Sequence, residues 1–155
     1  PELTECSTEE IVNAYDNTLL YTDHVLAQTI DLLQHNSQRL DTAMLYMSDH
    51  GESLGESGLY LHGLPYAMAP SEQTHIPMVL WLSNGIQQRQ GITPDCLEVK
   101  AKQPASQDNL FHSVLGLMDV HTDAYHAGLD LFRSCRPPAE GTYANHLLQQ
   151  EQVHF

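Results

Sequence analysis

Two short apolar runs, joined by a long polar connection, constrain the fold of this chain more than any other feature. Residues 43–48 and 76–82 are nearly continuous apolar stretches of strand length, and such runs are typical of strands buried on both faces of a parallel sheet. Pro77 stands at the start of the second run, where the loss of a backbone N–H is tolerated. The connection, residues 49–75, is rich in Gly, Ser and Pro. Connections this long in a compact domain are usually functional or flexible.

A long amphipathic helix is predicted before the first run. Ser7-Thr8-Glu9-Glu10 has the pattern of a capping box, in which Ser7 and Glu10 each satisfy a backbone N–H of the other. Apolar residues then recur at steps of three and four as far as His35-Asn36, and we expect this face to lie in the core. Its members are Ile11, Tyr15, Leu19, Thr22, Leu26, Ile30 and Leu33.

A second helix is predicted over residues 107–118, with Ser106 as its cap. Its expected apolar stripe consists of Leu110, Phe111, Val114, Leu115 and Met118. Residues 84–105 are predicted to be irregular because they are polar and hold two prolines, and a further short helix is possible at 143–152. The order helix, buried strand, loop, buried strand, helix indicates an α/β fold with a mostly parallel sheet.

Composition limits the partners of the chain. The 155 residues suffice for one compact domain, and 6 Lys and Arg against 20 Asp and Glu give a net charge of −14. So acidic a chain is unsuited to nucleic-acid binding or to charge-driven docking on anionic lipid, whereas an acidic cleft suits a divalent cation. No apolar run is long enough to span a bilayer. The start at Pro1, without a basic and apolar leader, indicates processing or excision.

The residues that follow the first apolar run carry the chemistry of the long loop. Ser48-Asp49-His50-Gly51-Glu52-Ser53 comes directly after a predicted strand, and sites in open α/β sheets gather beyond the carboxyl ends of strands. Asp49 and His50 offer the carboxylate oxygen and imidazole nitrogen that zinc accepts. Adjacent strand residues point to opposite faces, so the two can share one metal only where the chain turns, which Gly51 permits. His62 and His75 lie in the same loop.

These motifs, taken in order, closely resemble those of the lipid A phosphoethanolamine transferases, a family that includes the mobile colistin-resistance enzymes. The resemblance covers about residues 7–136, and residues 137–155 match no known pattern. The segments that carry it are SDHGESLGE at 48–56, GLYLHG at 58–63, AP at 69–70, QTHIPM at 73–78, YDNT at 15–18 and SQDNLFH at 106–112.

The resemblance implies a fold like that of alkaline phosphatases and sulfatases, a sandwich with helices on both faces of a mostly parallel sheet. Residues 1–136 would be the C-terminal part of the catalytic domain, and 137–155 a tail of unknown role. The domain would lie in the periplasm, behind an N-terminal domain in the bacterial inner membrane. A periplasmic setting favours disulfides. The spacing of the three cysteines does not decide their state, but only Cys96 and Cys135 both lie well inside the chain, so we expect them to pair. Cys6 would then remain a thiol or bridge to another chain.

For the site, the resemblance implies that Asp49 and His50 are zinc ligands. It implies that His62 lies beside the metal, where it binds substrate phosphate or a further zinc, and that Glu52 is an acid supporting the site. The family's threonine nucleophile, a glutamate ligand and another histidine come from earlier in its sequence, and no threonine here stands in a matching context. We therefore expect the isolated chain to hold about half of a site and to be inactive alone.

The implied reaction is zinc-dependent transfer of phosphoethanolamine from phosphatidylethanolamine to lipid A. Two alternatives stay open. One is another enzyme of the alkaline phosphatase superfamily, such as a sulfatase or a phosphoglycerol transferase. The other is a non-catalytic metal-binding or interaction module, which the missing nucleophile favours. Because the two apolar strands would expose unpaired edges, we also expect the chain to occur with the missing N-terminal part or to self-associate.

Overall fold

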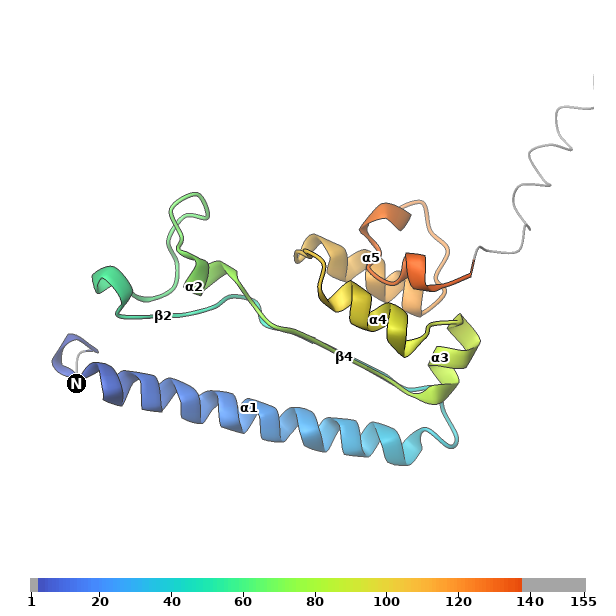
Figure 1. Cartoon of the computed structure of the whole chain (residues 1–155), viewed down its shortest axis with the longest axis horizontal. Helices are drawn as coiled ribbons and strands as arrows, with labels where there is room; N and C mark the ends of the chain where they lie inside the picture. Colours follow the sequence, from blue (N-terminus) through green and yellow to red (C-terminus); the bar gives the residue numbers. More distant parts are fainter. Residues whose placement is uncertain (1–2, 138–155) are drawn as a thin grey trace, which may run out of the picture. The chain divides into compact units, whose positions relative to one another are not determined.

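The computed structural model describes residues 3–137, which form two units (Figure 1). The boundary between the two units falls between Ile86 and Gln87, and each unit is described by itself. The predicted helix at 143–152, and all of the proposed tail except Pro137, lie outside the described residues.

The predicted first helix is confirmed. A 3-10 turn η1, Leu3–Glu5, precedes helix α1, Thr8–Asn36. The capping box is present: the Ser7 hydroxyl accepts a hydrogen bond from the Glu10 N–H at 3.3 Å, and a Glu10 carboxylate oxygen accepts from the Ser7 N–H at 2.9 Å. Two of the N–H groups that a helix start leaves unpaired are thereby satisfied.

The apolar face of α1 is buried less than the sequence predicts. Ile11 is buried and Tyr15 half-buried, but the side chain of Leu19 is exposed. The helix contacts strands β1, Ala43–Met47, and β2, Ser53–Leu54. At 1.5 Å per residue α1 is about 44 Å long, whereas a five-residue strand covers only about 17 Å. Within the described residues the helix therefore exceeds the sheet surface available to cover it.

The two apolar runs form neighbouring strands, but they pair antiparallel. Strand β4, Met78–Leu82, runs beside β1 with Ala43 opposite Leu82 and Met47 opposite Met78. Among residues 3–137 the mostly parallel sheet that the sequence predicts is not seen, because the loop between these two strands returns the chain alongside β1 without a crossover. The prediction that both strands are buried on both faces is wrong: Met44 of β1 is buried, but Met78 and Val79 of β4 are exposed. Over residues 3–137 this sheet has two strands, so each is an edge strand.

The loop between β1 and β4 has its own structure. It contains β2, the 3-10 turn η2, Glu56–Gly58, strand β3, Tyr60–Leu61, and the short helix α2, Ser71–Thr74. Strands β2 and β3 pair antiparallel. Gln73, which is buried, holds this loop to the end of β1: its carbonyl oxygen accepts from the Gly51 N–H at 2.9 Å, and its side-chain amide donates to the Ser53 hydroxyl at 2.9 Å. The loop is thus fixed next to the residues that follow β1.

Two helices occupy the stretch 84–105 that was predicted to be irregular. They are α3, Asn84–Gln90, and α4, Pro94–Ala101. The Thr93 hydroxyl caps α4 by accepting from the Cys96 N–H at 3.3 Å, and Pro94 takes the first helical turn, where no N–H is needed. The prediction of irregular structure is wrong here, because a proline in the first turn of a helix is compatible with that helix.

Helix α5, Asp108–Leu117, confirms the second predicted helix but not its buried face. Its buried residues are His112, Ser113, Gly116 and Leu117, whereas Phe111, Val114 and Met118 of the predicted stripe are exposed. The polar residues can be buried because they are paired: a ring nitrogen of His112 accepts from the His126 N–H at 3.1 Å, and the Ser113 hydroxyl accepts from the Leu131 N–H at 3.0 Å.

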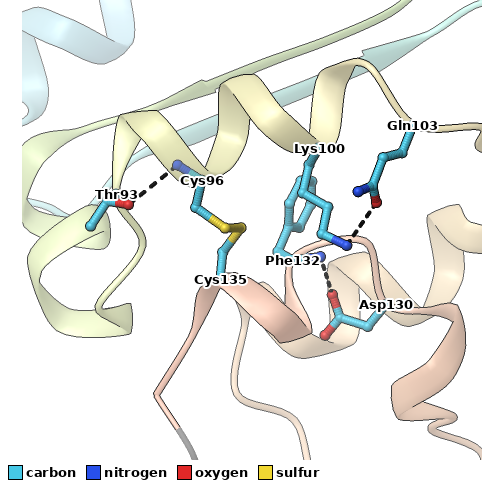
Figure 2. The surroundings of a disulfide bond; sticks show 7 residues. All are labelled: Thr93, Cys96, Lys100, Gln103, Asp130, Phe132 and Cys135. Atoms are coloured by element: carbon cyan, nitrogen blue, oxygen red, sulfur yellow. Dashed lines mark hydrogen bonds between the residues drawn. A yellow bond between two sulfur atoms is a disulfide. The ribbon is translucent and has the colours of Figure 1, made fainter.

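A disulfide joins α4 to the 3-10 turn η4, Arg133–Cys135 (Figure 2). The Cα atoms of Cys96 and Cys135 are 5.7 Å apart, within the usual range for a disulfide. The predicted pairing is confirmed. Cys6 carries a thiol outside this bond.

Candidate metal centre

The turn after β1 brings Asp49 and His50 together. The Ser48 hydroxyl donates to the His50 carbonyl at 2.7 Å, and this closes the turn. Gly51 lies so near helix α2 that a Cβ atom there would overlap the carbonyl oxygen of Glu72. Only glycine fits this close backbone approach without displacing the loop.

Asp49 and His50 point to a common region despite being adjacent in sequence. One Asp49 carboxylate oxygen accepts from the His50 N–H at 3.0 Å, and the other lies 3.8 Å from His50 Nε2. Two atoms bound to the same zinc at about 2.0–2.1 Å each can be at most about 4.2 Å apart. The separation of these two atoms therefore fits a shared ion.

The other ring nitrogen of His50 is held by the backbone. His50 Nδ1 lies 2.9 Å from the carbonyl oxygen of Gly51. A carbonyl only accepts hydrogen bonds, so this contact favours the tautomer with a proton on Nδ1, and Nε2 keeps its lone pair for a metal. Such a contact from a histidine's second nitrogen is usual at metal sites.

The β2–β3 hairpin brings Glu52 opposite His62. Ser53 pairs with Leu61 and Leu54 with Tyr60, so Glu52 and His62 occupy the next opposite positions. His62 Nδ1 lies 3.0 Å from a Glu52 carboxylate oxygen. This carboxylate is the better shielded of the site's acids, since the side chain of Glu52 is 19% exposed and that of Asp49 is 89% exposed.

His50, Glu52 and His62 together form a group that could hold a metal ion. The ligand atoms that they offer lie within 4.8 Å of one another. The rings of His50 and His62 face each other with centroids 3.6 Å apart, and His50 Nδ1 lies 3.9 Å from the Glu52 carboxylate. Two imidazoles and a carboxylate are a donor set that zinc accepts, so the residues present fit that ion.

The third histidine of the loop, His75, does not belong to the group of possible ligands. It ends α2, where its N–H donates to the Ser71 carbonyl at 2.7 Å. Glu52, expected to support the site, belongs to the group of possible ligands. The sequence signal that could have shown this is the hairpin register, which places Glu52 across from His62.

Comparison with known proteins places the chain in a family. A sequence profile described as sulfatase matches residues 2–120, which is more than half of the chain. The chain belongs to the sulfatase family. The α/β fold implied by the sequence resemblance agrees with this membership.

This sulfatase-family chain is similar to several phosphoethanolamine transferases. It is 48% identical over 140 residues to phosphoethanolamine transferase EptA of Escherichia coli K12, covering 90% of the chain and 26% of that protein. The integral membrane protein lipooligosaccharide phosphoethanolamine transferase A of Neisseria meningitidis superimposes with a TM-score of 0.83 and 46% identity, over 88% of the chain and 26% of that structure. The C-terminal periplasmic domain of Campylobacter jejuni phosphoethanolamine transferase EptC gives a TM-score of 0.75 and 45% identity, over 84% of the chain and 40% of that domain.

These similarities confirm the resemblance to phosphoethanolamine transferases. The chain spans about a quarter of the length of the EptA protein that it matches. Among residues 3–137, no helix has the length and apolar character needed to cross a membrane.

Proposed function

We propose that this chain is the C-terminal part of the catalytic domain of a zinc-dependent phosphoethanolamine transferase. The enzyme would move phosphoethanolamine from phosphatidylethanolamine to lipid A. The observation that carries the proposal is the convergence of Asp49 and His50 at the end of β1, beside the Glu52–His62 pair, in a chain 48% identical to an EptA protein.

Asp49 and His50 are proposed as the zinc ligands, through the carboxylate and Nε2. A zinc ion held there would lower the pKa of a coordinated hydroxyl and neutralise charge on phosphoryl oxygens. The Gly51 carbonyl orients the His50 ring for this role through its contact with Nδ1.

His62 is proposed as the residue that contacts the substrate phosphate, with Glu52 orienting it. With a proton on the nitrogen that faces Glu52, the imidazole would keep its position beside the ligands. Its side chain is 49% exposed, so an incoming phosphate can reach it. Glu52 also lies near His50 and thereby links the two histidines.

The nucleophile is proposed to come from an earlier part of the full-length protein, outside these 155 residues. A threonine hydroxyl would take the phosphoethanolamine group and release diacylglycerol, and a lipid A phosphate would then accept the group from the threonine. This chain supplies ligands and the substrate-binding histidine, so alone it would be inactive.

The location and domain assignment are part of the same proposal. Residues 1–136 would belong to a periplasmic catalytic domain at the inner membrane, which is consistent with the membrane and periplasmic relatives. Residues 137–155 would be a tail of unknown role. Partners would be the two lipid substrates and the remaining part of the same protein.

The test is a lipid assay on the full-length protein that contains this chain. Fluorescent phosphatidylethanolamine should be converted to diacylglycerol only when zinc is present, and chelation should stop the reaction. An aryl sulfate serves as the competing substrate. Release of sulfate without any diacylglycerol would favour a sulfatase, and zinc binding without either product would favour a non-catalytic module.

A further inference from the structure

A cavity in the second unit concentrates positive charge in an otherwise acidic chain. Its volume is about 650 Å³, and three of the six Lys and Arg residues in the sequence line it. The lining residues that matter are Lys100, Gly128, Asp130, Arg133, Ser134 and Arg136. The chain has 20 Asp and Glu residues, yet Asp130 alone among them lines this cavity.

Asp130 does not cancel the charge of the cavity. Its side chain is fully buried and forms an ion pair with Arg136. The same carboxylate accepts from the Tyr125 hydroxyl at 2.7 Å and from the Phe132 N–H at 2.8 Å. These contacts satisfy Asp130 and neutralise Arg136, so this pair adds no net charge to the lining.

Lys100 and Arg133 are the other two cations that line the cavity. Lys100 Nζ donates to the side-chain carbonyl of Gln103 at 3.0 Å, and an Arg133 guanidinium nitrogen donates to the Pro137 carbonyl at 3.3 Å. Both partners are neutral. Within residues 3–137, neither cation forms an ion pair with a carboxylate. Two uncompensated cations therefore face one cavity.

The disulfide holds the two sides of this cavity together. Lys100 follows Cys96 by one helical turn, so both side chains leave the same face of α4. Arg133 and Ser134 directly precede Cys135 in η4, and Figure 2 shows the Cys96–Cys135 bond linking α4 to that segment. The disulfide therefore holds together the two backbone segments that carry Lys100 and Arg133.

We propose that this cavity binds a phosphate group, with Lys100 and Arg133 as its charged contacts and the Ser134 hydroxyl as a further donor. A phosphate offers several acceptor oxygens and up to two negative charges, which matches two cations without acid partners. This inference does not depend on the proposed transferase reaction. The group can arrive as free phosphate or on a lipid headgroup.

The test is a titration of the ¹⁵N-labelled chain with inorganic phosphate at constant ionic strength, followed by NMR. We expect saturable shifts at the amides of Lys100, Arg133 and Ser134. Lys100→Gln and Arg133→Gln should each weaken binding about tenfold, the effect of losing one charge-assisted hydrogen bond. Lys102→Gln is the matched control. Lys102 lies at the end of α4, near Lys100 in sequence, but its Nζ forms an ion pair with a Glu98 carboxylate oxygen at 2.7 Å.

Gly128→Glu provides a second variant that leaves the fold intact. A Cβ atom at Gly128 would meet no other atom within 4 Å, so the new side chain has room, and its carboxylate would repel phosphate. Abolished phosphate binding with an unchanged thermal midpoint supports the proposal. Equal weakening in Lys102→Gln, or shifts that do not saturate, would overturn it, because either result indicates non-specific charge attraction.

Two binding experiments with lipid vesicles distinguish a lipid headgroup from free phosphate as the source of the phosphate group. The chain is mixed with phosphatidylglycerol vesicles and, separately, with phosphatidylcholine vesicles. Binding to the anionic vesicles that Arg133→Gln abolishes assigns the site to a lipid headgroup. Binding of inorganic phosphate without vesicle binding assigns it to a soluble phosphate. Vesicle binding that survives Arg133→Gln and Lys100→Gln together, without phosphate binding, would contradict the site.

Discussion

His62 Nδ1 lies 3.0 Å from the Glu52 carboxylate, although the two residues are ten positions apart in sequence. The β2–β3 hairpin causes this, since its register continues to an opposite pair at these positions. The hairpin therefore places a half-buried carboxylate beside the Nδ1 atoms of two histidines whose rings lie next to each other.

Replacing Glu52 should weaken zinc binding. Glu52→Gln keeps the shape of the side chain but removes the charge beside both histidines, and loss of such a supporting acid costs about 10–100-fold in metal affinity. The measurement is a zinc titration against a chromophoric chelator. Glu98→Gln is the control, because it removes an exposed carboxylate from α4 in the other unit. Equal zinc affinity in the two variants would remove Glu52 from the site.

Gly51→Ala should destabilise the loop. The added methyl group would overlap the Glu72 carbonyl oxygen and disturb the Gly51–Gln73 hydrogen bond. We expect a loss of about 1–3 kcal/mol in the free energy of unfolding, as for overpacked positions. Gly128→Ala, which has open space around it, should change stability by less than about 0.5 kcal/mol. Urea denaturation of both variants measures the difference, and similar losses would contradict the close approach at Gly51.

Removing the disulfide should destabilise the second unit. Cys96 and Cys135 are 39 residues apart, and a loop of that length corresponds to about 4 kcal/mol in the chain-entropy estimate. Cys96→Ser with Cys135→Ser should show this loss in thermal unfolding, while Cys6→Ser leaves the bond intact. Thiol titration of the denatured, unreduced chain should find one thiol. Three thiols would contradict the pairing.

The capping box of α1 should make stability depend on pH. The hydrogen bond from the Ser7 backbone N–H, and then that from its hydroxyl, holds the pKa of Glu10 below its ordinary value of 4.5. A carboxyl with a lowered pKa stabilises the fold above its unfolded pKa, and the effect disappears as the pH falls through its folded pKa. The thermal midpoint of Glu10→Gln should therefore lie below that of the parent at pH 7 and approach it in acid below pH 4.5. A difference that stays constant with pH would exclude this carboxylate as the cause.

Local patterns in the sequence predicted the long helix and the positions of both apolar strands. The capping box and the three- and four-residue spacing define α1 because they are set by neighbours in sequence. The antiparallel pairing of β1 with β4 could not be predicted, because it depends on how residues 48–77 fold, and a hydrophobic run does not encode strand direction.

The buried face of α5 could not be read from hydrophobicity. Gly116 is buried because the Asp130–Arg136 pair approaches it so closely that a Cβ atom would overlap the carboxylate. Such burial depends on polar groups that lie far along the chain. In the candidate site, the sequence predicted the turn that brings Asp49 and His50 together, because Gly51 permits it. The position of Glu52 could not be predicted in the same way, because it depends on the register between β2 and β3, which have only two residues each.

Mass spectrometry of lipid A decides whether the full-length protein that contains this chain is a phosphoethanolamine transferase. In Gram-negative cells that produce the parent protein, lipid A should gain the mass of one phosphoethanolamine group, and His50→Ala, produced at the same level, should abolish the gain. Unmodified lipid A with the parent protein, or undiminished modification with His50→Ala, would rule out the proposed function.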